Sequence, residues 1–366
     1  MSKNYLPEEI VEEILLRLPV KSLLRFRCVS KLWRSLISDP RFTKWQFGQA
    51  SQHPQRLLIS SSSEIRSLGC DVPFGDSSAL RELDVPFQRN GLRVRIIGSC
   101  NGLVCVALHS HKGFYIWNPS TGDHRKLPDP GAPPGGFIHW HGFGYDSSTD
   151  DYKLIVASYR LLNGGGRSSE GEVFSLKRNS WKGILHDLDH SYGATESAGI
   201  LCNGSLHWYL KVSEPASDEI HAFDLAEEKF HEIQMPIQED GHPRQPPFRI
   251  VRNLGGFLCL VGYTHTHIDI WRMMEYGIEE SWEPMLRVAY SRISRNSLPL
   301  WLSRGGQLVV IHAEKELMIS EPEGELEHVV TLGDFLCEAA VFVESLLSPN
   351  HYGGDERQRL LCDEDR

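Results

Sequence analysis

The chain has 366 residues, of which 40% are apolar and 23% are charged, and this composition suits a globular protein of two domains with a real core. The formal net charge is −10, but residues 1–50 hold nine Lys or Arg against five Asp or Glu, so the remainder carries −14. An acidic main domain argues against nucleic acid and anionic membrane lipid as partners, because both attract clustered cations.

The start of the chain has no apolar stretch of the signal-peptide kind, and no apolar run approaches the roughly 20 residues of a membrane span. The eight cysteines are scattered without a CxxC pair, a pattern typical of reduced thiols. These features predict a protein of the cytoplasm or the nucleus with no membrane partner.

Residues 1–47 predict a domain of three short helices. Pro7 suits a first helical position, and apolar residues then recur at helical spacing. Pro19 ends this helix and lets a second begin, while Ser30 is the expected N-cap of a third helix that ends before Pro40. So small a unit buries little surface by itself, and its many large apolar residues predict a partner protein that covers some of them.

Three segments of this domain, residues 6–10, 14–23 and 26–37, closely resemble the F-box of plant proteins. They contain its Leu-Pro opening, its second Leu-Pro pair and its Val-Ser-Lys-x-Trp-Arg segment. The resemblance implies binding to a Skp1-like adaptor, which links through a cullin and a RING subunit to ubiquitin transfer. The positions that match the motif's adaptor-facing or supporting residues are Leu6, Pro7, Ile10, Ile14, Leu18, Pro19, Leu23, Cys28, Val29 and Trp33. The sequence does not separate the two roles.

Residues 50–347 predict an all-β domain, because strand-like runs alternate with Gly, Asn, Asp and Pro turns and no long amphipathic helix lies between them. About six units of roughly 50 residues begin near positions 57, 102, 153, 204, 256 and 306. Short strands at this period are typical of a β-propeller with kelch-type spacing. The apolar run 339–346 predicts a strand that helps to close the ring, and residues 348–366 predict a disordered tail.

Several segments of the β domain are similar to the plant F-box-associated domain, among them residues 99–103, 116–121, 142–146, 203–208 and 269–276. The chain thus resembles plant F-box proteins of the F-box/kelch-repeat type. The resemblance implies a non-catalytic substrate-recognition subunit of an SCF-type (Skp1–cullin–F-box) ubiquitin ligase, with an unidentified protein as its target.

Two other functions remain open. The chain could bind the adaptor outside a ligase, as a scaffold or a sequestering protein. Its propeller could also bind or hydrolyse carbohydrate, since nine tryptophans offer surfaces on which sugars stack. The recurrence of tryptophan with the blade period favours a structural role for most of them.

Two histidine pairs, His139 with His141 and His265 with His267, could each present imidazoles on one strand face. Neither pair is accompanied by Cys or carboxylate residues at ordinary zinc spacing. No Ser/His/Asp or Cys/His arrangement stands out either. The sequence therefore predicts no metal site, no cofactor and no catalytic site.

Two pairs of adjacent acids, at positions 150–151 and 279–280, are predicted to lie in solvated turns, because neighbouring side chains of an extended segment point in different directions. The glycine-rich segment 163–169 is a candidate target-contacting loop, since loops on a rigid scaffold often carry recognition.

Overall fold

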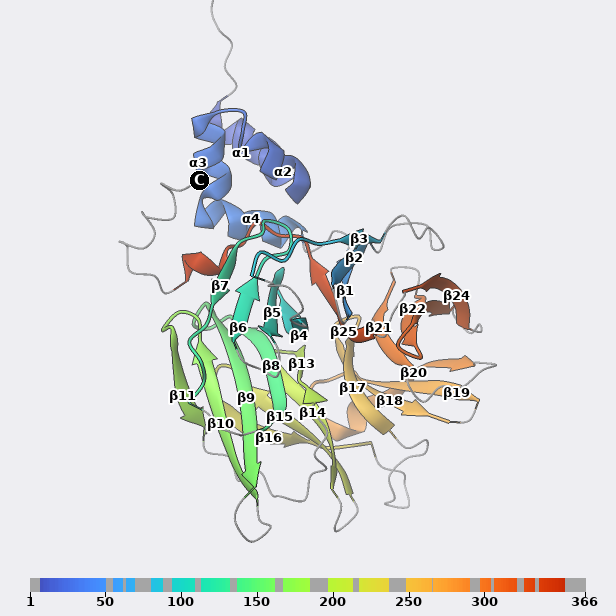
Figure 1. The fold of residues 1–366 in the computed structure, drawn as a ribbon. Coiled ribbons are helices and arrows are strands. Elements are labelled where there is room, and N and C mark those ends of the chain that lie inside the picture. The colour runs from blue at the N-terminus through green and yellow to red at the C-terminus, as the bar shows by residue number, and fades with distance from the viewer. Residues whose placement is uncertain are drawn as a thin grey trace, which may run out of the picture.

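The computed structural model describes residues 7–352, with gaps at 51–54, 62–63, 70–79, 88–93, 109–112, 132–136, 162–166, 185–196, 213–216, 237–247, 265, 290–296, 304–305, 321–325 and 333–335. A small helical unit stands on one face of a larger β structure (Figure 1). None of the helices described here is long and apolar enough to cross a membrane. The candidate loop at 163–169 falls largely in a gap, so its proposed contacts lie outside the described residues.

The helical unit has four helices rather than three: α1 (Glu8–Leu16), α2 (Val20–Phe26), α3 (Lys31–Ser38) and α4 (Pro40–Ala50). The N-cap at Ser30 is confirmed, because its Oγ accepts a hydrogen bond from the Trp33 amide at 3.1 Å. The third helix ends before Pro40 as predicted, but a fourth helix, which was not predicted, begins at Pro40. Proline fits the first position of a new helix, and the carboxylate of Asp39 caps that helix by accepting from the Arg41 amide at 2.7 Å.

The β structure consists of six sheets, as the repeat predicts, and each sheet is one blade. Blade 1 consists of β25 (Leu336–Val343), β1 (Gln55–Ser61), β2 (Ile65–Gly69) and β3 (Arg81–Glu82). Blade 2 consists of β4 (Val94–Cys100), β5 (Leu103–Leu108), β6 (Phe114–Trp117) and β7 (His124–Lys126). Blade 3 consists of β8 (Phe137–Asp146), β9 (Asp151–Leu161), β10 (Arg167–Ser175) and β11 (Ser180–Ile184), with the short β12 (Ser197–Ala198) parallel to β8.

The remaining three blades follow in chain order. Blade 4 consists of β13 (Ile200–Cys202), β14 (Ser205–Val212), β15 (Ser217–Asp224) and β16 (Lys229–Ile233). Blade 5 consists of β17 (Phe248–Leu254), β18 (Phe257–Tyr263), β19 (His267–Met273) and β20 (Trp282–Ala289), with the 3-10 turn η2 (Glu279–Ser281) before β20. Blade 6 consists of β21 (Leu298–Leu302), β22 (Leu308–His312), β23 (Glu316–Ser320) and β24 (Leu326–Thr331).

The first strands of the six blades form a closed inner ring. In order, β25, β4, β8, β13, β17 and β21 each contact the next, and β21 contacts β25. The predicted closing strand is confirmed, because β25 pairs antiparallel with β1 and so completes blade 1 with a segment from the far end of the sequence. Ring closure leaves no open edge between the first and last blades.

The periodic turn signals mark the turn between the first and second strands of a blade, not its beginning. Asn101 and Gly102 connect β4 to β5, and Asn203 and Gly204 connect β13 to β14. All four have positive φ, between 47° and 78°, as a two-residue hairpin turn of this type requires. The blades therefore start one strand earlier than the predicted units.

The two faces of the propeller carry different sets of connections. Each blade has four strands that alternate in direction, so the turns after the first and third strands all lie on one face. The helical unit stands on this face (Figure 1). The opposite ends of the strands carry the connections between blades, such as the 14 residues between β16 and β17.

Tryptophan side chains pack within and between blades. The Trp181 indole donates to the Pro128 carbonyl of the preceding blade at 2.8 Å, and Trp282 donates to the Gln234 carbonyl at 2.9 Å. All nine tryptophans lie among the described residues, and only Trp45, on the helical unit, is exposed.

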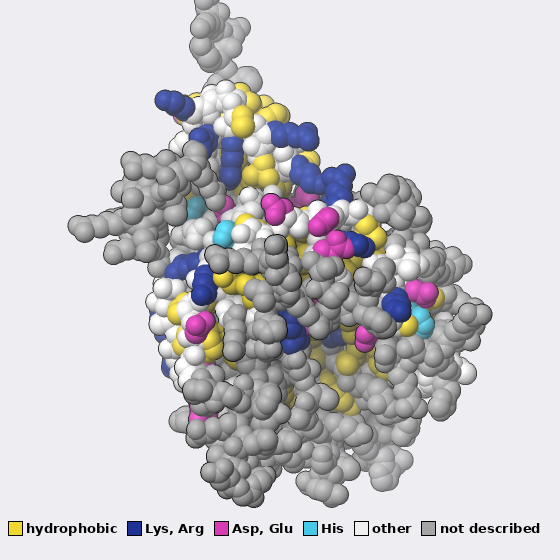
Figure 2. All heavy atoms as spheres, in the orientation of Figure 1, with side chains coloured by type: hydrophobic (Ala, Val, Ile, Leu, Met, Phe, Trp, Pro, Cys, Tyr) yellow, Lys and Arg dark blue, Asp and Glu magenta, His cyan; other side chains and the backbone are white. Residues whose placement is uncertain are grey.

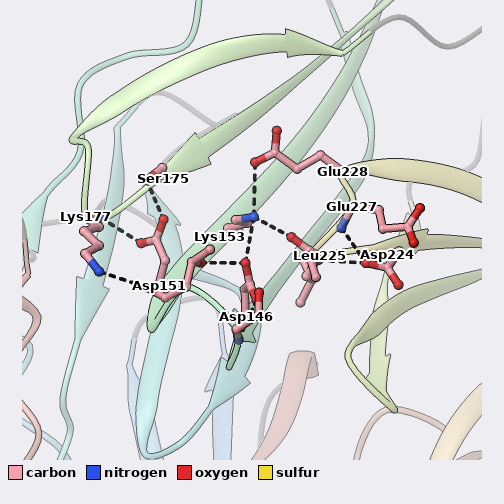
Figure 3. Close-up of polar contacts among 12 residues, drawn as sticks. Asp146, Asp151, Lys153, Ser175, Lys177, Asp224, Leu225, Glu227 and Glu228 are labelled. Atoms are coloured by element: carbon pink, nitrogen blue, oxygen red, sulfur yellow. Dashed lines mark hydrogen bonds and ion pairs between the residues drawn. The ribbon is translucent and has the colours of Figure 1, made fainter.

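A buried lysine connects blade 3 to blade 4 (Figure 3). The Lys153 ammonium lies 3.1 Å from a carboxylate oxygen of Asp146 and 3.1 Å from one of Glu228, and it donates to the Leu225 carbonyl. Burial alone would raise the pKa of Asp146, but hydrogen bonds from Ser148, Thr149 and Lys153 outweigh it and hold that pKa well below its ordinary value. The Asp146 carboxylate therefore remains ionised inside the protein.

Replacing Lys153 with methionine is expected to lower the free energy of unfolding by about 3–5 kcal/mol, because it leaves the buried Asp146 carboxylate without its counter-charge. Urea unfolding of the full chain measures the change. Lys229→Met is the control, since its ion pair with Glu227 is exposed on both sides and should be worth under about 1 kcal/mol. Equal effects of the two substitutions would contradict the importance of the buried charges.

A buried histidine connects blade 4 to blade 5. The Nδ1 atom of His207 lies 3.2 Å from the Ile200 carbonyl oxygen, which can only accept, so Nδ1 carries the proton. Nε2 then accepts from the Tyr276 hydroxyl at 2.8 Å. Burial lowers the pKa of His207 from its ordinary 6.5 to about 4, so the imidazole is neutral in the folded protein.

The depressed pKa of His207 predicts a loss of stability in mild acid. Below about pH 6.5 the unfolded chain binds a proton that the folded chain does not bind until about pH 4. This difference should remove about 3 kcal/mol between these pH values. Urea unfolding at several pH values should show a smaller pH dependence in His207→Gln than in the wild type. An unchanged slope would rule out His207 as its source.

Candidate functional site

Exposed hydrophobic side chains are concentrated on the helical unit. Seven large hydrophobic residues are exposed in the described part of the chain, and five of them lie on the helical unit although it forms a small part of the structure. The five are Ile10, Ile14, Val29, Leu32 and Trp45. Figure 2 shows hydrophobic side chains on this unit among Lys and Arg side chains. Such a concentration marks a surface that binds another protein.

Helix α1 presents two of these side chains on one side. Ile10 and Ile14 are 44% and 47% exposed and are four residues apart, so they lie one turn above the other. The next residue, Leu15, is fully buried in the core of the unit. The helix is thus apolar on two sides. The side with Leu15 packs in the core of the helical unit, and the side with Ile10 and Ile14 is exposed.

The turn before α3 presents a second group. Val29 is 60% exposed and Leu32 is 55% exposed, and they flank the N-cap Ser30. The hydrogen bond from the Trp33 amide to Ser30 fixes the start of the helix between them. Trp33 itself turns inward and meets Phe26 edge-to-face, with ring centroids 5.5 Å apart.

The structure separates surface positions from supporting positions among the ten predicted residues. Leu6 lies outside the described residues. The exposed members are Pro7, Ile10, Ile14, Pro19, Cys28 and Val29, the half-buried members are Leu18 and Trp33, and the fully buried member is Leu23.

Two exposed residues were missed from the sequence. Leu32 fits the apolar pattern of α3, and nothing in that pattern shows that it points away from the core. Trp45 lies on α4, which was not predicted. Recognising Asp39 as an N-cap would have predicted α4, which carries Trp45.

The core of the helical unit includes a residue from the opposite end of the sequence. Leu346 is 1% exposed and packs with the buried residues of the four helices. The helical members of this core are Leu15, Val20, Leu23, Ile37 and Phe42. The hydrophobic surface that so small a unit cannot cover alone is therefore partly covered from within the chain.

The segment after β25 is fixed to blade 2 on its way to the helices. The Asn118 side-chain amide donates to the carbonyl of Ser345 at 3.0 Å and to that of Leu347 at 2.7 Å. The Arg125 guanidinium donates to the carbonyl of Tyr352. The predicted start of a disordered tail at residue 348 is thus too early, because residues 348–352 are packed and include the 3-10 turn η3 (Pro349–His351).

Ion pairs complete the junction between the helices and the propeller. The Lys44 ammonium lies 2.5 Å from the Asp150 carboxylate, and the Tyr145 hydroxyl donates to the same carboxylate at 2.7 Å. Asp151 is buried and accepts from the Lys177 amide at 2.8 Å. The prediction that these two acids are merely solvated is wrong, because they fix the turn on which α4 rests. Glu279 and Glu280 do lie in a surface turn.

The structure describes the side chain of one member of each histidine pair. His141 is buried, and His267 lies 3.0 Å from Asp269, while the side chain of His139 and all of His265 lie outside the described part. One group that the sequence did not indicate, Glu219, His221 and Glu232, brings three ligand atoms within 4.8 Å on β15 and β16. There the His221 Nε2 atom is already engaged by Glu219 at 2.9 Å.

The fold and the exposed surface define a two-part binding protein, in which a helical docking unit is fixed to a closed six-bladed propeller. A family model described as F-box domain matches residues 4–45, and one described as F-box associated beta propeller domain matches residues 56–341. The chain therefore belongs to the F-box proteins with an F-box-associated propeller.

Relatives from Arabidopsis thaliana match along most of their length. The F-box/kelch-repeat protein At3g23880 is 28% identical over 95% of this chain and 97% of its own. The F-box protein CPR1 is 31% identical over 77% of this chain and 73% of its own. The F-box protein At5g49610 is 28% identical over 87% of this chain and 89% of its own.

Proposed function

We propose that this chain is the substrate-recognition subunit of an SCF-type ubiquitin ligase. The helical unit binds a Skp1-like adaptor, and the propeller binds a protein target. The observation that carries the proposal is the exposed apolar surface of the F-box, on a unit whose own core is already complete. The chain itself is not an enzyme in this proposal, since ubiquitin transfer takes place on the other subunits. It acts in the cytoplasm or the nucleus.

The junction between the two parts gives the proposal its mechanism. The adaptor covers Ile10, Ile14 and Val29, and this burial supplies the hydrophobic free energy of docking. Ion pairs and the packed segment 344–352 hold the F-box at a fixed angle to the propeller. A target on the propeller is therefore held in one position relative to the adaptor, as efficient transfer to its lysines requires.

Reconstitution from purified parts tests the proposal. The full chain is mixed with a Skp1-like adaptor and a cullin–RING module, and assembly is followed by size-exclusion chromatography. Formation of one complex containing all components is expected. An adaptor complex that excludes the cullin would support the scaffold alternative, and failure to bind the adaptor would reject both.

Target turnover separates the same alternatives in cells. Proximity labelling under proteasome inhibition, with the intact chain and an Ile14→Glu/Val29→Glu variant, identifies proteins whose lifetime depends on the F-box. A receptor shortens the lifetime of a labelled protein only when its F-box is intact. A scaffold labels the same proteins without changing their lifetime.

The carbohydrate alternative has little support. Sugar stacking needs an accessible aromatic face, whereas the eight tryptophans other than Trp45 are buried or half-buried among neighbouring strands and helices. Trp45 lies on the F-box and not on the propeller.

A further inference from the structure

The turn between β19 and β20 in blade 5 is an unusual part of the propeller surface. Met274 and Ile278 are 46% and 48% exposed, and they are the only exposed large hydrophobic residues of the propeller among those that the structure describes. Both lie on the turn formed by residues 274–281, which is called the blade 5 turn below.

The blade 5 turn is held in place by its own polar contacts. The Ser281 hydroxyl donates to the carbonyls of Glu275 and Ile278, at 2.9 and 2.7 Å. The Tyr276 side chain points inward and bonds to buried His207 of blade 4. Met274 and Ile278 are therefore held outward on a fixed support, so a partner that covers them orders little new structure.

Three carboxylates accompany the two apolar side chains. Glu275 and Glu280 are exposed and Glu279 is half-buried, and none of them forms an ion pair with a residue that the structure describes. Residues 51–366, which include the propeller, carry a net charge of −14. The turn thus combines apolar contact area with uncompensated negative charge, which complements a segment that combines apolar and basic residues.

The blade 5 turn lies on the same face of the propeller as the F-box. It follows the third strand of its blade, as the turn after β6 in blade 2 does, and the latter contacts segment 344–352 beneath the helices. Blade 5 is also three blades away from blade 2 around the ring, so the F-box of the same chain stands over the opposite side of this face.

We propose that the blade 5 turn is a docking site for the target protein, and that it binds an extended segment in which Lys or Arg residues alternate with large apolar residues. Met274 and Ile278 contact the apolar side chains, and the three glutamates attract the basic ones. This inference rests on the proposed function, and it places the target on the face that carries the adaptor-binding unit.

Binding of synthetic peptides to the full chain, alone and in complex with its adaptor, tests this site. The probe is a fluorescent peptide of repeated Lys-Leu-Gly-Ser units, and matched peptides carry Glu in place of Lys or Ser in place of Leu. Fluorescence anisotropy should show binding of the Lys-Leu peptide and at least tenfold weaker binding of both others. Equal binding of the Lys-Ser peptide, or no binding of the Lys-Leu peptide, would overturn the proposal.

Substitutions in the blade 5 turn test whether the Lys-Leu peptide binds there. Met274→Ser/Ile278→Ser should weaken Lys-Leu binding at least tenfold, and Glu275→Gln/Glu280→Gln should weaken it and reduce its salt dependence. Glu227→Gln, an exposed carboxylate on the matching turn of blade 4, should change nothing. Undiminished binding by the serine variant would overturn the site. If that variant melts at a lower temperature, the single Ile278→Ser variant carries the same test.

Adaptor binding is measured on the same samples, so that failure of the docking-site proposal can be distinguished from failure of the ligase proposal. Loss of peptide binding with adaptor binding intact is the expected behaviour of the turn variants. A chain that binds the peptide through the turn but never binds the adaptor would reject the ligase function and keep the docking site.

Discussion

The double substitution Ile14→Glu/Val29→Glu is expected to weaken binding of a Skp1-like adaptor by 100-fold or more. The two side chains are 47% and 60% exposed, so the folded chain tolerates the change, whereas a docked adaptor would bury both charges in an apolar interface. Central interface residues often contribute about 2 kcal/mol each, which corresponds to roughly 30-fold each in affinity. Surface plasmon resonance with purified adaptor measures the loss.

A closely matched control exists for this experiment. Ile278 is 48% exposed, almost the same as Ile14, but it lies on blade 5 instead of the F-box. Ile278→Glu introduces the same change at the same exposure and should leave adaptor affinity unaltered. Equal loss in both variants would mean that the effect is not specific to the F-box, and no loss in the double variant would reject the exposed surface as the adaptor site.

Removal of the Leu346 side chain is expected to destabilise the F-box selectively. This residue is 1% exposed in the core of the helical unit, and truncating a buried leucine to alanine costs about 2–5 kcal/mol. Hydrogen exchange should become faster in α1–α4 of Leu346→Ala, while the strands of blades 3–5 should keep their protection. The full chain, followed by mass spectrometry, is the sample for this measurement.

Two truncations extend this prediction. A chain that ends at Tyr352 keeps every described contact of the segment after β25 and should unfold like the wild type. A chain that ends at Glu344 loses Leu346 and the acceptors of the Asn118 amide, so its F-box should exchange rapidly. Normal F-box protection in the shorter chain would show that the helices do not need this segment.

Local signals in the sequence predicted local structure well. Pro19 separates α1 from α2, Ser30 caps α3, and the Asn-Gly pairs mark hairpin turns whose positive φ values few other residues adopt. In each case the residue acts on its immediate neighbours along the chain. The repeat was visible for the same reason, since blades 2, 4 and 5 each have a glycine with positive φ in the turn after their first strand.

The features that the sequence did not predict involve residues whose role depends on distant parts of the chain. The sequence pattern predicts that Leu346 ends a strand, and only the fold shows that its side chain packs in the core of the helical unit. The sequence around Asp150 predicts a surface acid. In the structure this acid pairs with Lys44, which is 106 residues away in sequence. The exposure of Leu32 likewise depends on which side of α3 the other helices cover, which its own pattern does not specify.

The position of segment 336–352 in the sequence has a consequence for biosynthesis. This segment supplies both the strand that closes the propeller and the leucine that completes the F-box core. The F-box emerges from the ribosome first, yet its core stays incomplete until residue 346 has followed, roughly 15–60 s later at about 5–20 residues per second. Prematurely terminated chains therefore carry an F-box without its last core residue, and full adaptor-binding competence becomes a sign that the propeller behind it has been made.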